Sequence, residues 1–232
     1  MRLEKLLLTM IAVMSASLVL QIATLYHVVV SDGSQAALPM ERLLEVPSDP
    51  LYLGSVPIRG DALVQIVIVE FIDYECPYCV AYTKDVYPHL LMEYVDAGRV
   101  RYASVNLPLD IHPTARNIAE MAVCADAQGA FWPVHDALLL RDDAPPIDVS
   151  IEAIDESGAD AMAFLHCVEA DLAVPVLEEQ AETAAILEIS ATPRFLVGTL
   201  DVHDIFLPRF LIVGVQPLSV VEAGIEAFVD WE

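Results

Sequence analysis

Two cysteines separated by two residues, Cys76-Pro77-Tyr78-Cys79, carry the clearest chemical signal in this 232-residue sequence. They follow an apolar run at residues 64–71 and precede a segment with helical spacing of apolar residues, so they stand at a strand-to-helix turn. The first sulfur then lies at a helix N-terminus, where unpaired N–H groups and the helix dipole favour a thiolate. The pattern predicts a dithiol that exchanges with disulfides.

A C-x-x-C pair can also supply half of a zinc site or form a plain structural disulfide. A four-cysteine zinc site usually draws on two close pairs, whereas the other two cysteines, Cys124 and Cys167, lie far apart in the sequence. A disulfide across so short a loop constrains little of the unfolded chain. Redox reactivity therefore explains the spacing better than either alternative.

Four further motifs follow in the sequence. They are Ile111-His112-Pro113, the segment Cys124-Ala125-Asp126-Ala127-Gln128-Gly129-Ala130-Phe131-Trp132 with His135, Ala191-Thr192-Pro193-Arg194-Phe195, and Gly214-Val215-Gln216-Pro217. Together with Phe71-Ile72-Asp73-Tyr74-Glu75-Cys76-Pro77-Tyr78-Cys79, they resemble DsbA-like thiol:disulfide oxidoreductases, thioredoxin-fold proteins of the bacterial cell envelope. The resemblance covers about residues 55–230. It implies an α/β thioredoxin fold with an inserted α-helical subdomain.

The resemblance also implies roles for the dithiol. Cys76 would be an exposed attacking thiolate and Cys79 a buried resolving thiol. Pro77 and Tyr78 between them are expected to contact the substrate. No metal, nucleotide or organic cofactor is implied. The enzyme would act on cysteine-containing exported proteins and would need a membrane redox partner to reoxidise it.

Thr192-Pro193 matches the family's cis-proline loop, which would offer its backbone to an extended substrate. Arg194 departs from the small or polar residue that commonly follows this proline. Its guanidinium either points outward into solvent, which is the expected state, or turns toward the dithiol. Cys124 and Cys167 fall on predicted helices of an exported chain, and we expect them to form a structural disulfide.

Glu70 interrupts a strand whose apolar run indicates burial on both faces, where an ionised carboxylate is costly. Burial should raise its pKa. The resemblance places a buried carboxyl at this position, six residues before Cys76, where it handles the proton of Cys79. The alternative is a strand-end glutamate that reaches solvent. His112 and His135 are interpreted as structural residues, in capping or packing.

The periodicity predicts the order strand, helix, strand, helical insertion, hairpin and helix. The expected ranges are 64–71, 77–97, 100–107, about 112–189, 194–197 paired with 210–213, and 218–228. Gly98 suits the C-terminal cap of the active-site helix. The segment 198–208 is interpreted as a long hairpin loop, with His203 exposed in it.

The N-terminal segment 1–31 is predicted to be a signal-anchor or transmembrane helix. Arg2 and Lys5 precede a stretch without charged residues that is long enough to span a bilayer, and they place that end in the cytoplasm. Residues 32–57 would be a tether and N-terminal extension, and 58–232 the DsbA-like domain outside the membrane. A cleaved signal peptide is the alternative and would release a secreted protein. Both place the domain in an oxidising compartment.

The formal net charge of −24, from 35 acidic and 11 basic residues, argues against nucleic acid and anionic lipid headgroups as partners. A solvated acidic face and adaptation to high salt both fit this charge. Two functional alternatives stay open. One is a tethered reductase or isomerase for selected clients. The other is a module that binds copper or a client protein through the dithiol without turnover.

Overall fold

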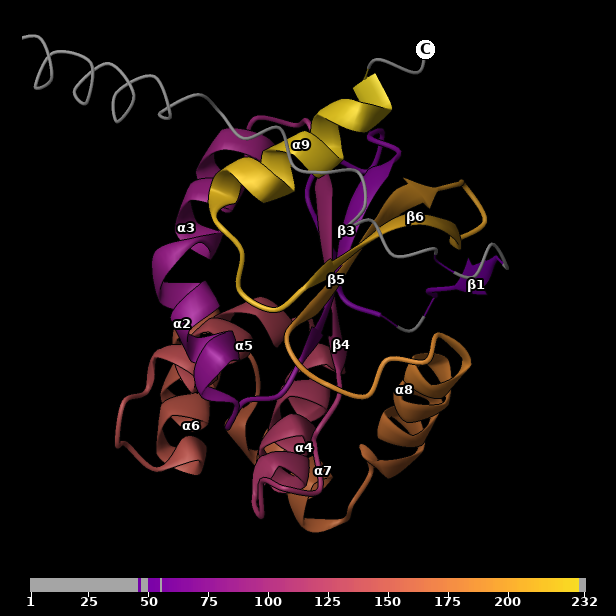
Figure 1. The fold of residues 1–232 in the computed structure, drawn as a ribbon. Coiled ribbons are helices and arrows are strands. Elements are labelled where there is room, and N and C mark those ends of the chain that lie inside the picture. The colour runs from indigo at the N-terminus through magenta and orange to yellow at the C-terminus, as the bar shows by residue number, and fades with distance from the viewer. Residues whose placement is uncertain (1–45, 47–49, 55, 230–232) are drawn as a thin grey trace, which may run out of the picture. The chain divides into compact units, whose positions relative to one another are not determined.

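The computed structural model describes residues 46, 50–54 and 56–229, which form a mixed α/β fold (Figure 1). The predicted N-terminal helix at 1–31 and most of the predicted tether at 32–57 lie outside these residues. Within the described part of the chain, no helix is both long and apolar enough to cross a bilayer.

A six-stranded sheet lies at the centre of the described region, with strand order β1-β6-β5-β3-β4-β2. Strands β3 and β4 are parallel, and the other neighbouring pairs are antiparallel. The predicted α/β class and thioredoxin-like fold are confirmed. The strands are β1 Leu51–Tyr52, β2 Ile58–Arg59, β3 Ile66–Ile72, β4 Arg101–Asn106, β5 Arg194–Leu200 and β6 Ile205–Val213.

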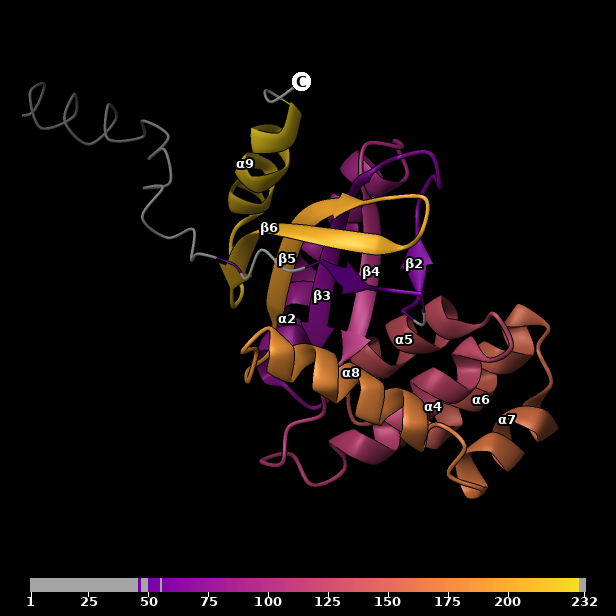
Figure 2. The same cartoon turned by 90° about the vertical axis from the view of Figure 1, so that its right-hand side faces the viewer.

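Helices cover both faces of the sheet and extend beyond one end (Figures 1 and 2). One face carries α2, α3 and α9, and the other carries α8. Helices α4 to α7 pack together where β3 and β4 end. The helical insertion predicted at about 112–189 contains these four helices and also α8, which packs against the sheet instead. The helices are α2 Pro77–Asp85, α3 Tyr87–Leu90, the π-helix η2 Leu91–Val95, α4 Ala115–Asp126, α5 Phe131–Leu140, α6 Pro146–Ser157, α7 Ala161–Glu169, α8 Val174–Ile186 and α9 Leu218–Val229.

Alternation along β3 divides its side chains between two hydrophobic cores. Val67, Val69 and Phe71 pack in the core that includes α8, whereas Ile68 packs in the core beneath α2, α3 and α9. Because successive strand side chains point to opposite faces, Glu70 shares the face of Ile68. The one carboxylate within β3 therefore points toward the layer that contains the active-site helix.

The predicted single helix over 77–97 is broken into α2, α3 and η2. Pro88 explains the break, because proline lacks an N–H and its ring clashes with the carbonyl four residues earlier. Gly98 ends the segment as predicted, with a φ of +66° and an N–H that donates back into the last turn at 3.0 Å. The break leaves α2 as a short helix directly behind the dithiol.

The hairpin of β5 and β6 is longer than predicted, and the expected loop at 198–208 is mostly strand. The turn is confined to residues 201–204 and contains the exposed His203. Gly198 and Pro208 suggested a loop, yet they face each other across the two strands at a register shift. A Cβ at Gly198 would lie 2.2 Å from the Leu207 carbonyl oxygen, so close backbone approach requires this glycine.

The packed unit begins earlier than the predicted boundary at residue 58. Leu51 and Leu53 are buried in the core that includes α8, and β1 pairs with β6. Part of the predicted tether therefore belongs to the sheet. A two-residue strand is too short to show an alternating pattern, so the sequence carries no periodic signal for it.

Candidate active site

Helix α2 begins directly at the dithiol. Cys76 is its N-cap, with an extended backbone (φ −70°, ψ 118°), and Pro77 occupies the first turn. Proline suits this position because the first helical N–H groups have no partner within the helix. The N–H groups of Cys79 and Val80 donate to the Cys76 carbonyl at 3.0 and 3.1 Å. The Cys76 sulfur therefore lies at the positive end of the helix dipole.

The two thiols of the motif have opposite acidities. Hydrogen bonding to the Cys79 side chain is the main cause that lowers the pKa of Cys76 to about 5; Thr192 and backbone N–H groups add to it, and partial burial opposes it. Burial raises the pKa of Cys79, and the hydrogen bond with Cys76 and the charge of Glu70 raise it further. At neutral pH Cys76 is the thiolate and Cys79 keeps its proton.

Cys76 is less exposed than predicted, because the chain before β5 covers its sulfur. Only 4% of the residue is exposed, and its Sγ lies 3.4 Å from the Thr192 carbonyl oxygen. Cys79 is fully buried. Pro77 and Tyr78 project into solvent from the start of α2, and Tyr78 is 65% exposed. A substrate approaching the sulfur would therefore meet these two residues.

Strand pairing brings the proline loop to the dithiol. In the register of β3 and β5, Phe71 pairs with Arg194, so Thr192 and Pro193 lie just beyond the end of β3, where the chain continues to Cys76. The Thr192-Pro193 peptide bond is cis. The Arg194 guanidinium donates to the Pro193 carbonyl at 3.1 Å, and it is not among the groups that shift the pKa of Cys76.

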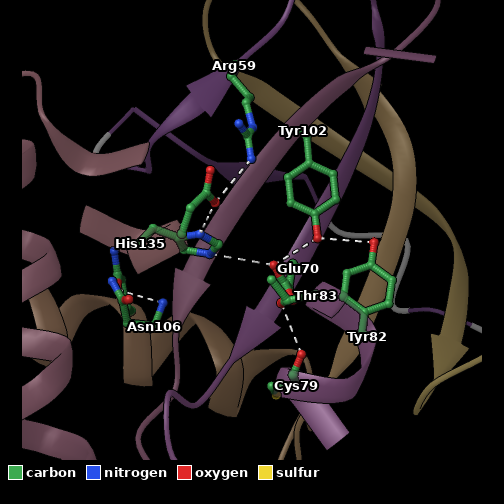
Figure 3. A network of polar contacts seen from close by, with 10 residues as sticks. Arg59, Glu70, Cys79, Tyr82, Thr83, Tyr102, Asn106 and His135 are labelled. Carbon is green, nitrogen blue, oxygen red and sulfur yellow. Dashed lines mark hydrogen bonds and ion pairs between the residues drawn. The ribbon is translucent and has the colours of Figure 1, made fainter. Parts of the chain in front are cut away.

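Glu70 is buried beneath α2, with 1% of the residue exposed, which contradicts the alternative of a strand-end glutamate in water. The Tyr102 hydroxyl donates to its Oε2 at 2.8 Å and lies 3.3 Å from the Tyr82 hydroxyl (Figure 3). Burial raises the pKa of Glu70 to about 8, although the Tyr102 hydrogen bond opposes the shift. Its effect on the pKa of Cys79 shows that the two groups interact.

His135 was predicted to have a packing role, and the structure gives it a polar contact as well. Its ring packs against the rings of Tyr74, Tyr87, Phe131 and Trp132. Its Nε2 also faces Glu70 at 3.9 Å from Oε2, which the interpretation of His135 as a packing residue missed. The adjacent His-Asp pair within an otherwise apolar helix was the available sequence signal.

Arg59 on β2 is a second neighbour of Glu70 that sequence reasoning did not identify. Its guanidinium stacks over the rings of Trp132 and Tyr87, at 4.2 and 4.7 Å from their centroids, and lies 3.5 Å from Asp136. Burial lowers the pKa of Arg59, while the charges of Asp136 and Glu70 oppose that shift. A cation and two carboxyl groups are thus arranged around one buried imidazole.

A second histidine lies close to the dithiol. Asp73, whose side chain is fully buried, accepts hydrogen bonds from the Glu75 and Leu109 N–H groups, both at 2.8 Å. His112 Nδ1 lies 2.8 Å from the same carboxylate, and this hydrogen bond raises the pKa of His112. The pair ties the loop after β4 to the chain just before Cys76, which agrees with a structural role for His112.

The other two cysteines form a disulfide between α4 and α7. Cys124 and Cys167 are bonded, with Cα atoms 5.7 Å apart, so neither is available as a zinc ligand in this state. Both lie in the core of the helical insertion, where Cys124 is buried. In the part of the chain that the structure describes, no cluster of three or more His, Cys, Asp or Glu side chains could hold a metal ion.

Comparison with known proteins supports the assignment of the fold. A family model described as Thioredoxin matches residues 54–205. The chain is 33% identical over 157 residues to the Na(+)/H(+) antiporter NhaA 3 of Salinispora tropica, which covers 67% of this chain and 23% of that protein. The chain thus spans about a quarter of the length of the antiporters that it matches.

Two further relatives carry names from disulfide chemistry. Disulfide bond formation protein D of Bacillus subtilis is 29% identical over 85 residues, which cover 35% of this chain and 37% of that protein. The crystal structure of alpha-DsbA1 from Wolbachia pipientis superposes with a TM-score of 0.62 at 20% identity, over 78% of this chain and 97% of that one. The DsbA-like resemblance is confirmed at the level of the fold.

Proposed function

The chain belongs to the thioredoxin family, and on that premise we propose that it is a thiol:disulfide oxidoreductase that acts through Cys76 and Cys79. One observation carries the proposal. Cys76 is the N-cap of α2, where its pKa is lowered to about 5, while Cys79, one helical turn onward, is fully buried, which raises its pKa. A structural disulfide needs no such difference, whereas exchange needs one sulfur that attacks and leaves as a thiolate.

The reaction would begin from the Cys76–Cys79 disulfide. A substrate thiolate attacks Cys76 Sγ, the bond to Cys79 breaks, and a mixed disulfide forms while Cys79 leaves and gains a proton. A second substrate thiolate then attacks the substrate sulfur of the mixed disulfide, which releases the oxidised substrate and the Cys76 thiolate. Two electrons pass from the substrate thiols to the enzyme.

Glu70 would handle the proton of Cys79. With a pKa of about 8, its carboxyl holds a proton at neutral pH and can donate it to Cys79 as that sulfur leaves. During reoxidation, a disulfide of the membrane partner is attacked first by Cys76, and Cys79 then resolves the mixed disulfide. Glu70 in its ionised form would take the Cys79 proton at that step.

The acidity of Cys76 favours the oxidising direction. A thiolate stabilised in the reduced enzyme makes the dithiol form more stable and the disulfide a stronger oxidant. This supports formation of disulfides over the tethered reductase or isomerase that shares the same chemistry. The Pro77-Tyr78 dipeptide contains no histidine, so the stabilisation would come from Cys79, Thr192 and the helix N-terminus.

The expected substrates are exported proteins with reduced cysteines. An extended segment would lie along the Thr192-Pro193 backbone and contact Pro77 and Tyr78. The expected location is the outer side of the cell membrane, with the N-terminal helix as tether and a membrane redox partner as reoxidant. Secretion would follow if the N-terminal segment were cleaved.

The test uses the oxidised protein and a peptide that carries two reduced cysteines. Turnover should convert the peptide to its disulfide. The Cys79→Ser variant, preloaded with a small thiol on Cys76, should exchange that thiol for a single-cysteine peptide and keep the peptide as a mixed disulfide at Cys76, detected by mass spectrometry. If the dithiol retained copper after purification and did not oxidise the peptide, a binding module would replace the enzyme.

A further inference from the structure

The imidazole of His135 connects the buried Glu70 to the protein surface. His135 lies on α5, only 1% exposed, with Nε2 3.9 Å from Glu70 Oε2 and Nδ1 3.0 Å from Asp136 Oδ1. Figure 3 shows the His135 ring facing Glu70. Asp136 has 37% of its side chain exposed. One end of this chain of groups is therefore buried, and the other end reaches water.

The contacts of His135 fix which nitrogen carries the proton. The Asp136 carboxylate can only accept, so Nδ1 carries the hydrogen that it donates to Asp136. Burial lowers the pKa of His135, which keeps the ring neutral and Nε2 unprotonated. His135 Nε2 and Glu70 Oε1 are both buried polar atoms without a hydrogen-bond partner. An acceptor and a carboxyl group without full hydrogen bonding thus face each other.

Arg59 holds the outer end of this chain in place. Its guanidinium lies 3.5 Å from the Asp136 oxygen that His135 also contacts, and it is fixed by stacking on Trp132. The positive charge of Arg59 therefore faces the carboxyl group that accepts from His135. Arg59 and Asp136 come from different elements, β2 and α5, so the contact also ties the helical insertion to the sheet.

We propose that His135 and Asp136 form the path by which Glu70 exchanges its proton with solvent. The proposal rests on the proposed function, in which Glu70 takes the proton of Cys79. His135 and Asp136 do not touch the reacting sulfurs, so they act as positioning residues for a proton. The path explains how a carboxyl group that is buried away from water can lose or regain its proton between turnovers.

The transfer balances within the named groups. Glu70 gives its proton to His135 Nε2 as His135 gives its Nδ1 proton to Asp136, and Asp136 releases a proton to water. The ring returns to its first tautomer by rotation or by reverse exchange. The 3.9 Å gap exceeds a hydrogen bond, which has a donor–acceptor distance of about 2.7–3.2 Å, so the Glu70 carboxyl must move closer for the transfer.

Other titratable groups surround the path and set its direction. Those that face Glu70 or His135 come from five elements and from the chain before α2; they are Arg59, Tyr74, Cys79, Tyr82, Tyr87, Tyr102 and Asp136. Burial raises the pKa of Tyr74, Tyr82 and Tyr102 well above its usual value, so these phenols keep their protons at neutral pH. Asp136 is the group among them that can pass a proton to water.

A two-phase assay separates the path from the chemistry that it serves. The reduced protein is mixed with dithionitrobenzoate, which releases one coloured thiolate when Cys76 attacks and a second when Cys79 resolves the mixed disulfide. Below pH 8 Glu70 holds a proton and must lose it before it can accept that of Cys79. Loss of the path should therefore slow the second phase and leave the first phase unchanged.

Asp136→Asn and His135→Gln are the test variants. Each should slow the second phase by about tenfold, less than the about 10²–10⁴-fold that general acid–base groups contribute. Because the variants lack the internal path, their second phase should accelerate as imidazole buffer is added, whereas that of the parent should not. A purely structural role would not create this dependence on buffer. If His135→Gln does not fold, Asp136→Asn alone decides the test, since its side chain is partly exposed.

Asp142→Asn is the matched control, because Asp142 is an exposed carboxylate that pairs with Lys84 on the outer side of α2. It should show parental rates in both phases. Parental second-phase rates in Asp136→Asn and His135→Gln, with a slow second phase in Glu70→Gln, would overturn the path and leave the proposed function standing. Absence of both phases in the parent would overturn the proposed function instead.

Discussion

Two pairs of cysteines in this chain share one hydrophobic core and differ in the groups next to their sulfurs. Cys124 and Cys167 join two helices within an apolar core and form a disulfide. Cys76 and Cys79 lie at a helix N-terminus, above a buried carboxyl group, and are free thiols of opposite acidity. Sequence separation, the helix N-terminus and nearby charge therefore decide which pair stabilises the fold and which pair reacts.

The contrast follows from the length of the loop that each disulfide closes. A bond across two residues restricts little of the unfolded chain, so Cys76–Cys79 adds little stability and can open at little cost. A bond across a separation of 43 residues restricts far more. The disulfide of the helical insertion is thus structural, whereas that of the thioredoxin-like part is proposed to be redox-active.

The largest expected effect comes from removing one sulfur of the reactive pair. Cys76→Ser should abolish disulfide exchange, because Cys79 keeps its proton and is fully buried. Oxidation of a dithiol peptide measures the loss. The Cys124→Ser, Cys167→Ser double variant is the control and should oxidise the peptide at the parental rate at a temperature where it is folded. Substantial activity in Cys76→Ser would place the attacking sulfur elsewhere.

Removal of the proton-transfer group should give the next largest effect. Glu70→Gln should slow resolution of the mixed disulfide by about 10²-fold, at the lower end of general acid–base contributions, and leave the attack by Cys76 nearly unchanged. The pH dependence of resolution should flatten. Stopped-flow measurement of mixed-disulfide decay checks both statements. A parental rate across the pH range would show that Glu70 does not carry the Cys79 proton.

The same substitution should change how stability depends on pH. The pKa of Glu70 is raised from 4.5 in the unfolded chain to about 8 in the folded protein. The stability of the fold with neutral Glu70 is therefore fully present below pH 4.5 and is lost as the pH rises through 8. The parent should therefore lose unfolding free energy over this window relative to Glu70→Gln, by a few kcal/mol. Denaturant unfolding of both proteins at pH 4.5 and 9 measures the difference. A constant difference across the window would contradict the raised pKa.

Removing the Cys124–Cys167 disulfide should lower stability and leave disulfide exchange intact. The Cys124→Ser, Cys167→Ser double variant should lose roughly 4 kcal/mol of unfolding free energy, because the unfolded chain regains the freedom of a long loop. Denaturant titration of the oxidised parent and the variant gives the value. In the matched comparison, Cys76→Ser, Cys79→Ser should lose much less. Equal losses of unfolding free energy in both double variants would remove the distinction between a structural and a redox-active disulfide.

The reactive pair and its covering loop were predictable because their signals are local. The spacing of the dithiol, the strand before it and the Thr192-Pro193 motif all lie in short, continuous segments. The break at Pro88 was missed by the prediction of one helix over 77–97, although proline inside a helix has a known cost and gave a local signal. The motif order of the family predicted the order of the remaining elements, including the helical insertion, but not the two-residue strands β1 and β2.

The surroundings of Glu70 could not be read in the same way. Arg59 lies on a two-residue strand, and its stacking on Trp132 arises only when β2 pairs with β4. His135 was interpreted as a packing or capping residue because Phe131 and Trp132 precede it in the sequence, although Asp136 follows it directly. Contacts between residues far apart in the chain have no pattern in a single sequence, so this part of the site appears only in three dimensions.

The rate of alkylation of each thiol in the reduced protein, followed against pH with the modified site assigned by mass spectrometry, tests the central claim most directly. Cys76 should react with an inflection near pH 5, and Cys79 should stay unreactive through neutral pH. Two equal profiles with the inflection of a free cysteine, near pH 8.5, would contradict the account.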